Sequence, residues 1–365
     1  MIPRSMKALQ IIAPGVVELR EVPVPAVGPA DVLVKVAAAG ICHSDLHVLH
    51  AQRIRERPMT LGHEIAGTVA ALGDAVARDA VAGVAGAGVA GAAGIQVGTA
   101  GVVYLCWSCG VCRACASGRE NACLAAGRAA MPPCPGLGPD GGMAEYVRVP
   151  AAAFVPATLD PVQAAPLADA ALTSYHAIRS AREHLRPGGT AVVIGVGGLG
   201  HLGVQILKAI SPVRVIAIDV AEDKRALATA LGADLALPSD EHAAARILGL
   251  TGGLGADAVF DFVGVDATAR LSVQTVAPGG AYRMVGLGGG TPGVAADGAM
   301  GDGWPWGASI EKTYAGTRRD LIDSLALAAD GKIRVQVETF PLADGVAVLG
   351  RLERGLISGR AVLLP

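Results

Sequence analysis

The most constraining feature of the chain is a glycine-rich segment placed between a buried strand and a helix. The apolar run 192–194 leads directly into Gly195-Val196-Gly197-Gly198-Leu199-Gly200, and a helix is expected from 199 to 210. The first glycine of such a turn permits the sharp bend, the second lets the backbone approach a pyrophosphate, and the third lets the helix pack closely on the strand. Because the chain contains 50 glycines, it is this strand-and-helix context that makes the spacing predict dinucleotide binding.

The region around this turn alternates strands and helices, which indicates parallel βαβ units. Strands are expected at 190–194, 213–219, 258–263 and 281–287, and a helix at 222–231 follows the one after the glycines. Asp219 ends the second strand, where a carboxylate accepts hydrogen bonds from the adenosine ribose and repels a 2′-phosphate. This favours NAD over NADP, because the nearby cations Lys224 and Arg225 do not occupy the strand end.

The remainder of the chain has a different pattern, and a length of 365 residues favours two domains. Short apolar runs divided by proline and glycine at 7–39, with further runs at 64–72 and 143–150, predict brief antiparallel strands. We expect a β-rich domain at 1–164 and 317–365, enclosing an α/β domain at 165–316. A strand at 310–315 and a helix at 319–330 should lead into a strand at 335–340 of the β-rich domain.

Charge and composition narrow the class of partner. Thirty Lys and Arg are interspersed with 32 Asp and Glu, which gives a net charge of −2 and excludes a basic surface for nucleic acid or anionic membranes. Residues 80–94 are rich in Ala and Gly, which gain little from lipid, so a surface loop is expected there rather than a membrane span. The amino terminus has no apolar leader, which predicts a cytoplasmic location.

Seven cysteines, an odd number in a reducing compartment, indicate metal binding rather than disulfides. Four of them follow the spacing Cys109-x2-Cys112-x2-Cys115-x7-Cys123, which can close a tetrahedral, structural zinc site. Cys106 offers a rival register with Cys109, Cys112 and Cys115 that is typical of an iron–sulfur cluster. Gly110 and Gly118 lie where tight turns are needed and favour zinc in the first register, which leaves Cys106 and Cys134 as packed or unpaired thiols.

A second group of ligand-type residues lies earlier in the chain, in Cys42-His43-Ser44-Asp45-Leu46-His47 and Gly62-His63-Glu64. A thiolate and an imidazole need one more ligand to form a three-ligand zinc site with an open position. Such a site lowers the pKa of bound water from 15.7 to about 7, a shift worth about 12 kcal/mol. A side-chain hydrogen bond, at roughly 1 kcal/mol net, could not supply this.

These motifs occur in the same order in a known family. The chain resembles the zinc-dependent medium-chain alcohol dehydrogenases over nearly its full length, and especially the bacterial NAD-dependent secondary-alcohol dehydrogenases, through residues 165–176 and Gly316-Thr317-Arg318. The resemblance implies a doubly wound, parallel-sheet Rossmann coenzyme domain and a β-rich GroES-like catalytic domain. It implies two zinc ions per chain, NAD, hydride transfer between an apolar secondary alcohol and its ketone, and a homodimer or homotetramer formed through the strand at 310–315.

The resemblance also assigns residues. Asp169 becomes the third ligand of the catalytic zinc beside Cys42 and His63, Glu64 a carboxylate that can approach the metal, and Asp45 the acceptor that orients His63. Ser44 hydrogen-bonds the alcohol and His47 passes its proton to solvent. The implied coenzyme contacts are His43 and Arg360 at the pyrophosphate, Thr173 at the nicotinamide, Lys224 at the adenosine ribose, and also Val263 and Val285, beside Gly195, Gly197, Gly198, Leu199, Gly200 and Asp219.

Some alternatives stay open. On the same scaffold the enzyme could oxidise polyols or primary aromatic alcohols, and a different class of function is a non-catalytic redox sensor that binds zinc and a dinucleotide. A zinc-free quinone reductase should lack both metal motifs. The segment 80–94 is longer than is usual in the family, and Thr99 stands where an Asp commonly follows Val-Gly. Trp304 and Trp306 could serve the subunit interface, the pocket or the core.

Overall fold

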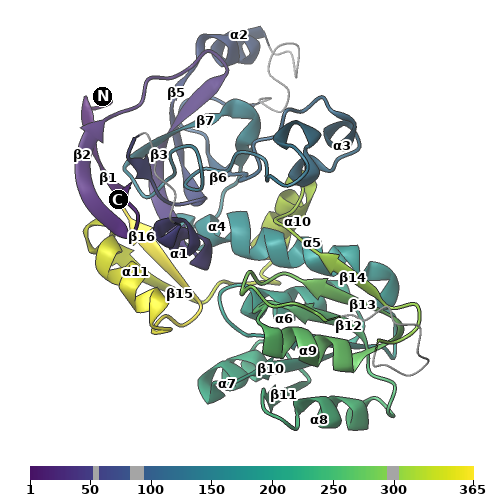
Figure 1. Ribbon diagram of the computed structural model, residues 1–365. Coiled ribbons are helices and arrows are strands. Elements are labelled where there is room, and N and C mark those ends of the chain that lie inside the picture. Colours follow the sequence, from purple (N-terminus) through teal and green to yellow (C-terminus); the bar gives the residue numbers. More distant parts are fainter. Residues whose placement is uncertain (52–56, 83–93, 294–303) are drawn as a thin grey trace. The chain divides into compact units, whose positions relative to one another are not determined.

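The computed structural model describes residues 1–51, 57–82, 94–293 and 304–365, and the chain divides into two compact units (Figure 1). Unit 1 comprises Met1–Asp169, Gly316–Ala329 and Val335–Pro365, and unit 2 comprises Ala170–Ala315 and Asp330–Arg334. The first boundary falls after Asp169, whereas the sequence predicted it after residue 164. Most of the Ala/Gly-rich segment, residues 83–93, lies outside the described residues.

Unit 2 is a doubly wound α/β domain with a six-stranded parallel sheet in the order β11-β10-β9-β12-β13-β14. The chain runs outward from β9 in both directions, so right-handed crossovers place the connecting helices on opposite faces of the sheet. Its strands are β9 (Thr190–Ile194), β10 (Arg214–Asp219), β11 (Leu235–Pro238), β12 (Ala256–Asp261), β13 (Val276–Met284) and β14 (Ser309–Lys312). Its helices are α5 (Leu172–Ser180), α6 (Gly200–Ile210), α7 (Glu222–Ala230), α8 (Ala243–Leu250) and α9 (Asp266–Thr275).

The sequence explains the burial of this sheet. All five residues of β9 are buried, as are five of the six in β10, because strands covered on both faces are continuous Val, Ile and Ala runs. The order reverses between β9 and β12, and ligands of such sheets bind at the carboxyl ends of the strands beside this reversal. The expected elements at 190–194, 199–210 and 222–231 are confirmed to within one residue. Strand β11 and helices α8 and α9 were not predicted, and the last strand is shorter than the expected 310–315.

Unit 1 is β-rich. Strands β2 (Val16–Pro23), β1 (Ser5–Ala13) and β4 (Met59–Thr60) form a small sheet. A seven-stranded sheet contains β15 (Val337–Pro341), β16 (Arg360–Leu364), β3 (Asp31–Ile41), β5 (Glu64–Leu72), β6 (Ala100–Val103) and β8 (Phe154–Pro156), with β7 (Tyr146–Pro150) paired to β3. The helices are α1 (His43–His50), α2 (Asp74–Ala82), α3 (Arg113–Ala116), α4 (Pro161–Pro166), α10 (Arg318–Ala329) and α11 (Gly345–Glu353). The antiparallel pairing of β1 with β2 and of β3 with β5 and β7 confirms the expected strands.

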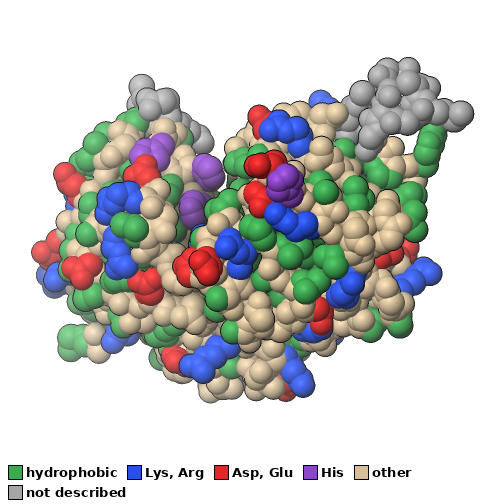
Figure 2. All heavy atoms as spheres, turned by 90° about the horizontal axis from the view of Figure 1, so that it is seen from below, with side chains coloured by type: hydrophobic (Ala, Val, Ile, Leu, Met, Phe, Trp, Pro, Cys, Tyr) green, Lys and Arg blue, Asp and Glu red, His purple; other side chains and the backbone are tan. Residues whose placement is uncertain are grey.

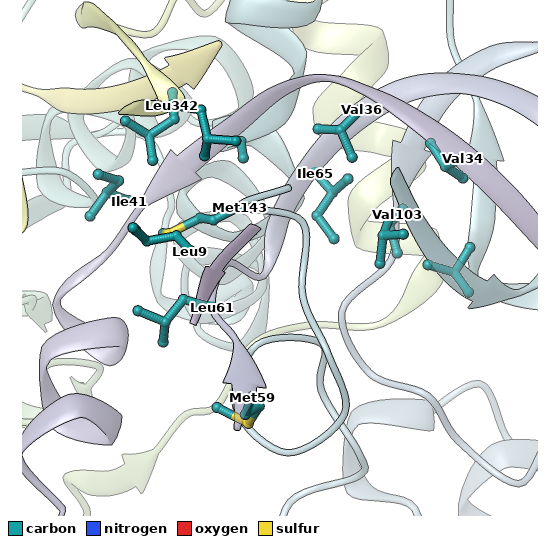
Figure 3. Close-up of a cluster of buried hydrophobic side chains, with 14 of the residues drawn as sticks. Leu9, Val34, Val36, Ile41, Met59, Leu61, Ile65, Val103, Met143 and Leu342 are labelled. Carbon is teal, nitrogen blue, oxygen red and sulfur yellow. The ribbon is translucent and has the colours of Figure 1, made fainter. Parts of the chain in front are cut away.

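Figure 3 shows part of the hydrophobic core of unit 1, which includes residues that adjoin the ligand-type residues in the sequence. Ile41 is fully buried and precedes Cys42, while Ile65 is fully buried and follows Glu64. Leu9, Leu61 and Met143 complete this part of the cluster. Because Ile41 and Ile65 are packed in the core, the positions of the adjoining polar residues at the strand ends are also fixed.

The surface agrees with the balanced charge of the sequence. On the face shown in Figure 2, Lys and Arg side chains alternate with Asp and Glu side chains and no patch of a single sign is formed. None of the described helices is long and apolar enough to cross a bilayer.

Candidate active site

Three side chains of the types that bind zinc converge within unit 1. Cys42 follows β3, His63 precedes β5, and Asp169 comes from a helical segment more than a hundred residues later. Oδ2 of Asp169 lies 3.4 Å from Sγ of Cys42 and 3.5 Å from Nε2 of His63, and all three ligand atoms lie within 4.8 Å of one another. A thiolate, an imidazole and a carboxylate at this spacing fit a zinc ion with three protein ligands.

An irregular helix places Asp169 at this point. Asp160 caps α4 by accepting a hydrogen bond from Val162 N at 3.0 Å, and the regular helix ends at Pro166. Proline lacks the N–H that a regular turn would use, and residues Leu167–Ala171 form a π-helical turn that contains Asp169. Such turns are rare and are frequent at functional sites.

One carboxylate orients two of the three candidate ligands. Oδ2 of Asp45 accepts a hydrogen bond from Cys42 N at 2.8 Å, and Oδ1 lies 3.4 Å from Nδ1 of His63. Nε2, on the other side of the His63 ring, lies 3.5 Å from Oδ2 of Asp169. Burial lowers the pKa of His63, but the charge of Asp45 and the contact with Asp169 outweigh it and raise that pKa well above its usual value. The surroundings of His63 therefore favour the protonated, positively charged imidazole.

A buried ion pair adjoins this group. Glu64 and Arg360 are almost completely buried, and Oε1 of Glu64 accepts hydrogen bonds from Nε at 3.0 Å and from Nη2 of Arg360. Nη2 also donates to Oδ2 of Asp169 at 3.0 Å. Burial raises the pKa of Glu64 to about 8 even though Arg360 opposes this. The family resemblance placed Arg360 at the pyrophosphate and Glu64 near the metal, whereas here Arg360 joins Glu64 to the third candidate ligand.

The ion pair depends on the absence of a side chain at residue 40. Gly40 lies opposite Glu64 in the β3–β5 ladder. A Cβ atom on residue 40 would lie 1.8 Å from Oε2 and 2.9 Å from Cβ of Glu64. The glycine of the Gly-Ile-Cys motif therefore provides the space that the Glu64 carboxylate occupies, a role that sequence analysis did not identify.

The four-cysteine lobe forms the second metal-type cluster. The sulfurs of Cys109, Cys112, Cys115 and Cys123 lie within 4.8 Å of one another. The amides of Cys109, Cys112 and Leu124 each donate to one of these sulfurs at 3.4 Å. Hydrogen bonds from the amides of Cys115 and Leu124 lower the pKa of Cys112 to about 6, which favours the thiolate that a metal requires.

This cluster selects between the two cysteine registers. Cys106 is buried but is not one of the four clustered sulfurs, and the same holds for Cys134. Gly110 and Gly118 have φ values of 74° and 71°, the left-handed conformation that favours glycine. The geometry therefore matches the zinc register with Cys123 and not the iron–sulfur alternative.

Helix α1 carries the residues that the sequence assigned to the proton path. Ser44 is half-buried, and its Oγ lies 3.6 Å from Sγ of Cys42, within hydrogen-bond distance for a thiol donor. His47 is exposed and lies three residues further on, which places it on the same side of the helix. His43, the first residue of α1, is also exposed.

The glycine-rich turn of unit 2 has the geometry of a phosphate loop. Gly195 has a φ of 86°, and a Cβ at Gly200 would lie 1.7 Å from the carbonyl oxygen of Gly195. Both positions therefore require glycine. A Cβ at Gly197 would meet no atom within 4 Å, so the backbone there is open to a ligand. Helix α6 begins at Gly200, and its amino terminus favours negative charge.

Asp219 supports this loop as well as ending β10. Its Oδ2 accepts a hydrogen bond from Val196 N at 2.7 Å, and its Oδ1 accepts one from Ala221 N at 3.0 Å. Nη1 of Arg225 donates to the carbonyl oxygens of Asp219 and Val220 at 3.0 and 2.8 Å. Contrary to expectation, the guanidinium of Arg225 therefore reaches the strand end.

Four more of the expected coenzyme residues lie in unit 2, whereas His43 and Arg360 lie in unit 1. Thr173 is buried on α5, Lys224 is half-buried on α7, and Val285 is buried just after β13. Val263 is exposed and follows β12. A Cβ on Gly195 would lie 2.5 Å from Cγ2 of Val263, so the residues after β12 contact the start of the glycine-rich turn.

Comparisons with known proteins agree with these sites. Residues 28–159 match the family "Alcohol dehydrogenase GroES-like domain" and residues 198–330 match "Zinc-binding dehydrogenase". An alcohol dehydrogenase of Geobacillus stearothermophilus is 35% identical over 352 residues, which cover 95% of each chain. The solved alcohol dehydrogenase of the archaeon Aeropyrum pernix has a TM-score of 0.86 at 32% identity and covers 98% of this chain and 100% of its own. An acetophenone reductase of Geotrichum candidum, solved with NAD, has a TM-score of 0.80 at 31% identity and covers 100% and 98%.

The role of Gly40 can be tested by adding one methyl group. Gly40→Ala should destabilise the protein by about 1–3 kcal/mol, because the buried Glu64 must move away from Arg360. The free energy of unfolding, measured in urea at a fixed zinc concentration, checks this. Gly249→Ala in helix α8 is the matched control, since its Cβ meets no atom within 4 Å, and it should stabilise the protein by up to about 1 kcal/mol. Equal stability of Gly40→Ala and the parent protein would contradict the steric argument.

Proposed function

The chain belongs to the family of zinc-dependent medium-chain alcohol dehydrogenases, and we propose that its reaction takes place at Cys42, His63 and Asp169. It is an NAD-dependent enzyme that transfers a hydride between an alcohol and the corresponding carbonyl compound. The observation that carries the proposed site is the convergence of these three ligand atoms, from three separate elements, within 4.8 Å. A redox sensor without catalytic function would not need this set of ligands.

The chain's own residues prepare the site for a divalent cation. Zinc supplies a Lewis acid that makes an alcohol proton easier to remove near neutral pH, and NAD supplies the hydride acceptor. Cys42 and Asp169 contribute two negative charges, so the centre is close to neutral and can accept either the alcohol or the carbonyl compound. Asp45 holds the His63 ring with Nε2 directed to the other two ligands. The four-cysteine lobe holds the second zinc and has a structural role.

We assign the proton path to helix α1. Ser44 lies beside Cys42 and accepts the proton of the alcohol, while His47 is exposed and can pass it to solvent. A hydroxyl relays a proton without holding charge, whereas an imidazole can take up a proton on a ring nitrogen. The half-buried position of Ser44 and the exposed position of His47 on one side of the helix support this order.

We assign the coenzyme to the carboxyl ends of the strands in unit 2, with the pyrophosphate at the glycine-rich turn and the adenosine ribose at Asp219. Lys224 is proposed to support the ribose and Thr173 the nicotinamide. The turns that contain Val263 and Val285 follow the strands on the other side of β9. A dinucleotide binds across such a strand reversal, so these turns are proposed to contact the nicotinamide half.

We propose apolar secondary alcohols and ketones as substrates. The motifs shared with secondary-alcohol dehydrogenases support this, and so does the acetophenone reductase, whose substrate is an apolar ketone and which is 31% identical to this chain.

The chain's cysteines form no disulfides, which supports a cytoplasmic location. Cell fractionation tests the location.

We further propose that the enzyme is a homodimer or homotetramer assembled through the edge of the unit 2 sheet. Strand β14 lies at one end of the sheet order, and all four of its residues are exposed. Trp306, just before it, is 77% exposed. Among the described residues β14 pairs only with β13, and such an edge beside an exposed aromatic side chain is a surface that a second copy can cover by extending the sheet.

Removal of the third ligand tests the proposed site. Asp169→Ala should reduce bound zinc from two ions per chain toward one and lower NAD-linked oxidation of 2-butanol by more than about a hundredfold. Metal analysis of the purified protein and an assay of NADH formation measure the two effects. In the matched variant Cys123→Ser, the other zinc should be lost and stability should fall. An Asp169→Ala protein with two zinc ions and parental activity would rule out this site.

A substrate panel tests the proposed class. The value of kcat/KM with NAD should be higher for 2-butanol and 1-phenylethanol than for benzyl alcohol, as the resemblance to secondary-alcohol dehydrogenases implies. It should also be higher than for a polyol, because a site that accepts apolar alcohols would leave the extra hydroxyl groups without hydrogen-bond partners. The initial rate of NADH formation measures each value. Faster turnover of benzyl alcohol would favour a primary aromatic alcohol dehydrogenase, and faster turnover of a polyol would favour a polyol dehydrogenase.

A charge on the edge strand tests the assembly. Ile310→Glu should shift the protein toward monomers, because two sheet edges that carry buried carboxylates repel each other. Light scattering after size-exclusion chromatography measures the mass. Ile322→Glu on helix α10 is the control, since Ile322 and Ile310 are similarly exposed, at 39% and 36%, and it should leave the mass unchanged. A mass unaffected by Ile310→Glu would exclude this edge as the interface.

A further inference from the structure

A buried carboxylate that the hydride chemistry does not use lies at the end of β12. Asp261 is the last residue of this strand and has no exposed surface. Its Oδ1 accepts hydrogen bonds from the amides of Val263 and Gly264, both at 2.9 Å. Its Oδ2 accepts one from the hydroxyl of Tyr282 at 3.3 Å. A buried carboxylate is costly unless donors compensate its charge, and here three neutral donors do so.

The backbone of the same residue holds a second turn. The carbonyl oxygen of Asp261 accepts hydrogen bonds from the amides of Val285 and Gly286, both at 2.9 Å. A Cβ on Gly264 would lie 2.2 Å from the carbonyl oxygen of Gly286, and one on Gly286 would lie 2.2 Å from the carbonyl carbon of Val263. The two turns therefore pack backbone against backbone, and hydrogen bonds to Asp261 set their spacing where no side chain fits.

These turns lie next to the glycine-rich turn. Val263 approaches Gly195, and the amide of Phe262 donates to the carbonyl oxygen of Ile194 at 2.9 Å. Strand β9 lies between β10, which ends in Asp219, and β12, which ends in Asp261. The two carboxylates thus lie on either side of the phosphate loop. Each accepts hydrogen bonds from the backbone amides of a neighbouring turn. Asp219 supports the adenosine side, which leaves Asp261 on the side where the other half of a dinucleotide would lie.

We propose that Asp261 is the positioning residue for the nicotinamide half of the coenzyme. This inference rests on the proposed function, in which the turns of Val263 and Val285 contact that half. The carboxylate fixes the Val263 turn, the carbonyl fixes the Val285 turn, and Tyr282 holds the second carboxylate oxygen. Because both turns are hydrogen-bonded to Asp261, a small displacement of this residue moves the coenzyme contacts of both turns together. The adenosine side, which is held by Asp219, is left unchanged.

The experiment compares two ligands that differ only in the nicotinamide. Asp261→Asn keeps the shape of the side chain but removes its charge and one acceptor. The Kd of NADH should rise about tenfold, and the Kd of ADP-ribose should stay within twofold of the parent value, both measured by titration calorimetry on the zinc-loaded protein. Tyr282→Phe removes one of the three donors and should raise the Kd of NADH about threefold. In steady-state assays the KM for NAD should rise in both variants.

A carboxylate at the opposite end of the same strand provides the control. Oδ2 of Asp257 accepts a hydrogen bond from the amide of Thr190 at 2.7 Å, so Asp257→Asn makes the same side-chain change far from the carboxyl ends of the strands. Both dissociation constants should be unchanged in this variant. If Asp257→Asn affected NADH as much as Asp261→Asn does, general loosening of the domain would explain the loss and the proposal would be overturned.

The outcomes separate this inference from the proposed function. If the parent enzyme binds NADH no more tightly than ADP-ribose, the assignment of these turns to the nicotinamide is wrong, and the inference falls with it. If the parent discriminates between the ligands but Asp261→Asn leaves both constants unchanged, or weakens both equally, only the positioning role is wrong. Should Asp261→Asn fail to fold, Tyr282→Phe decides the question, because an unchanged Kd for NADH in that variant overturns the proposal.

Discussion

The structure of unit 1 depends on a group of charges removed from water. Asp45, Glu64 and Arg360 are almost completely buried, and Asp169 and Cys42 adjoin them. Removing one partner of a buried ion pair leaves the other charge uncompensated and costs roughly 3–5 kcal/mol. Arg360 contacts both Glu64 and Asp169. A divalent cation held by Cys42, His63 and Asp169 would add further positive charge beside these buried carboxylates, so the acidic surroundings favour cation binding.

Strand pairing explains how these charges meet. Strands β5, β3 and β16 are antiparallel neighbours, with Glu64 opposite Gly40 and Ala361 opposite Ile41. Glu64 and Arg360 therefore start their strands at the end of the sheet where β3 delivers Cys42. Gly40 leaves room between them, and the Glu64 carboxylate fills it. The ligand group is thus a consequence of register: a shift by one residue would turn each of these side chains to the other face.

Local spacing predicted part of the site, and long-range contacts decided the rest. The four cysteines lie within fifteen residues and the glycine-rich turn within six, so their patterns are readable in the sequence. Asp169 contacts Cys42 across 127 positions and Arg360 contacts Glu64 across 296. No local pattern encodes such pairs, and for this reason Asp169 came only from the family resemblance and Arg360 was given a different partner. The only local signal of the π-helical turn at Asp169 in the sequence is Pro166, which lies inside a helical segment.

Buried aspartates fix several loops in a chain that has few large side chains. Only 3% of the residues are aromatic and 50 are glycine, so many loops lack large side chains that could fix them by packing. Instead, buried carboxylates accept loop amides: Asp45 from Cys42, Asp219 from Val196, Asp261 from Val263, and Asp320 from Thr317. Hydrogen bonds to charged groups contribute roughly 1.5–3 kcal/mol each, comparable to burying a Leu side chain. Three of these four carboxylates hold the backbone beside a proposed ligand or coenzyme contact, so in this chain the aspartates supply the rigidity that packed side chains would otherwise provide.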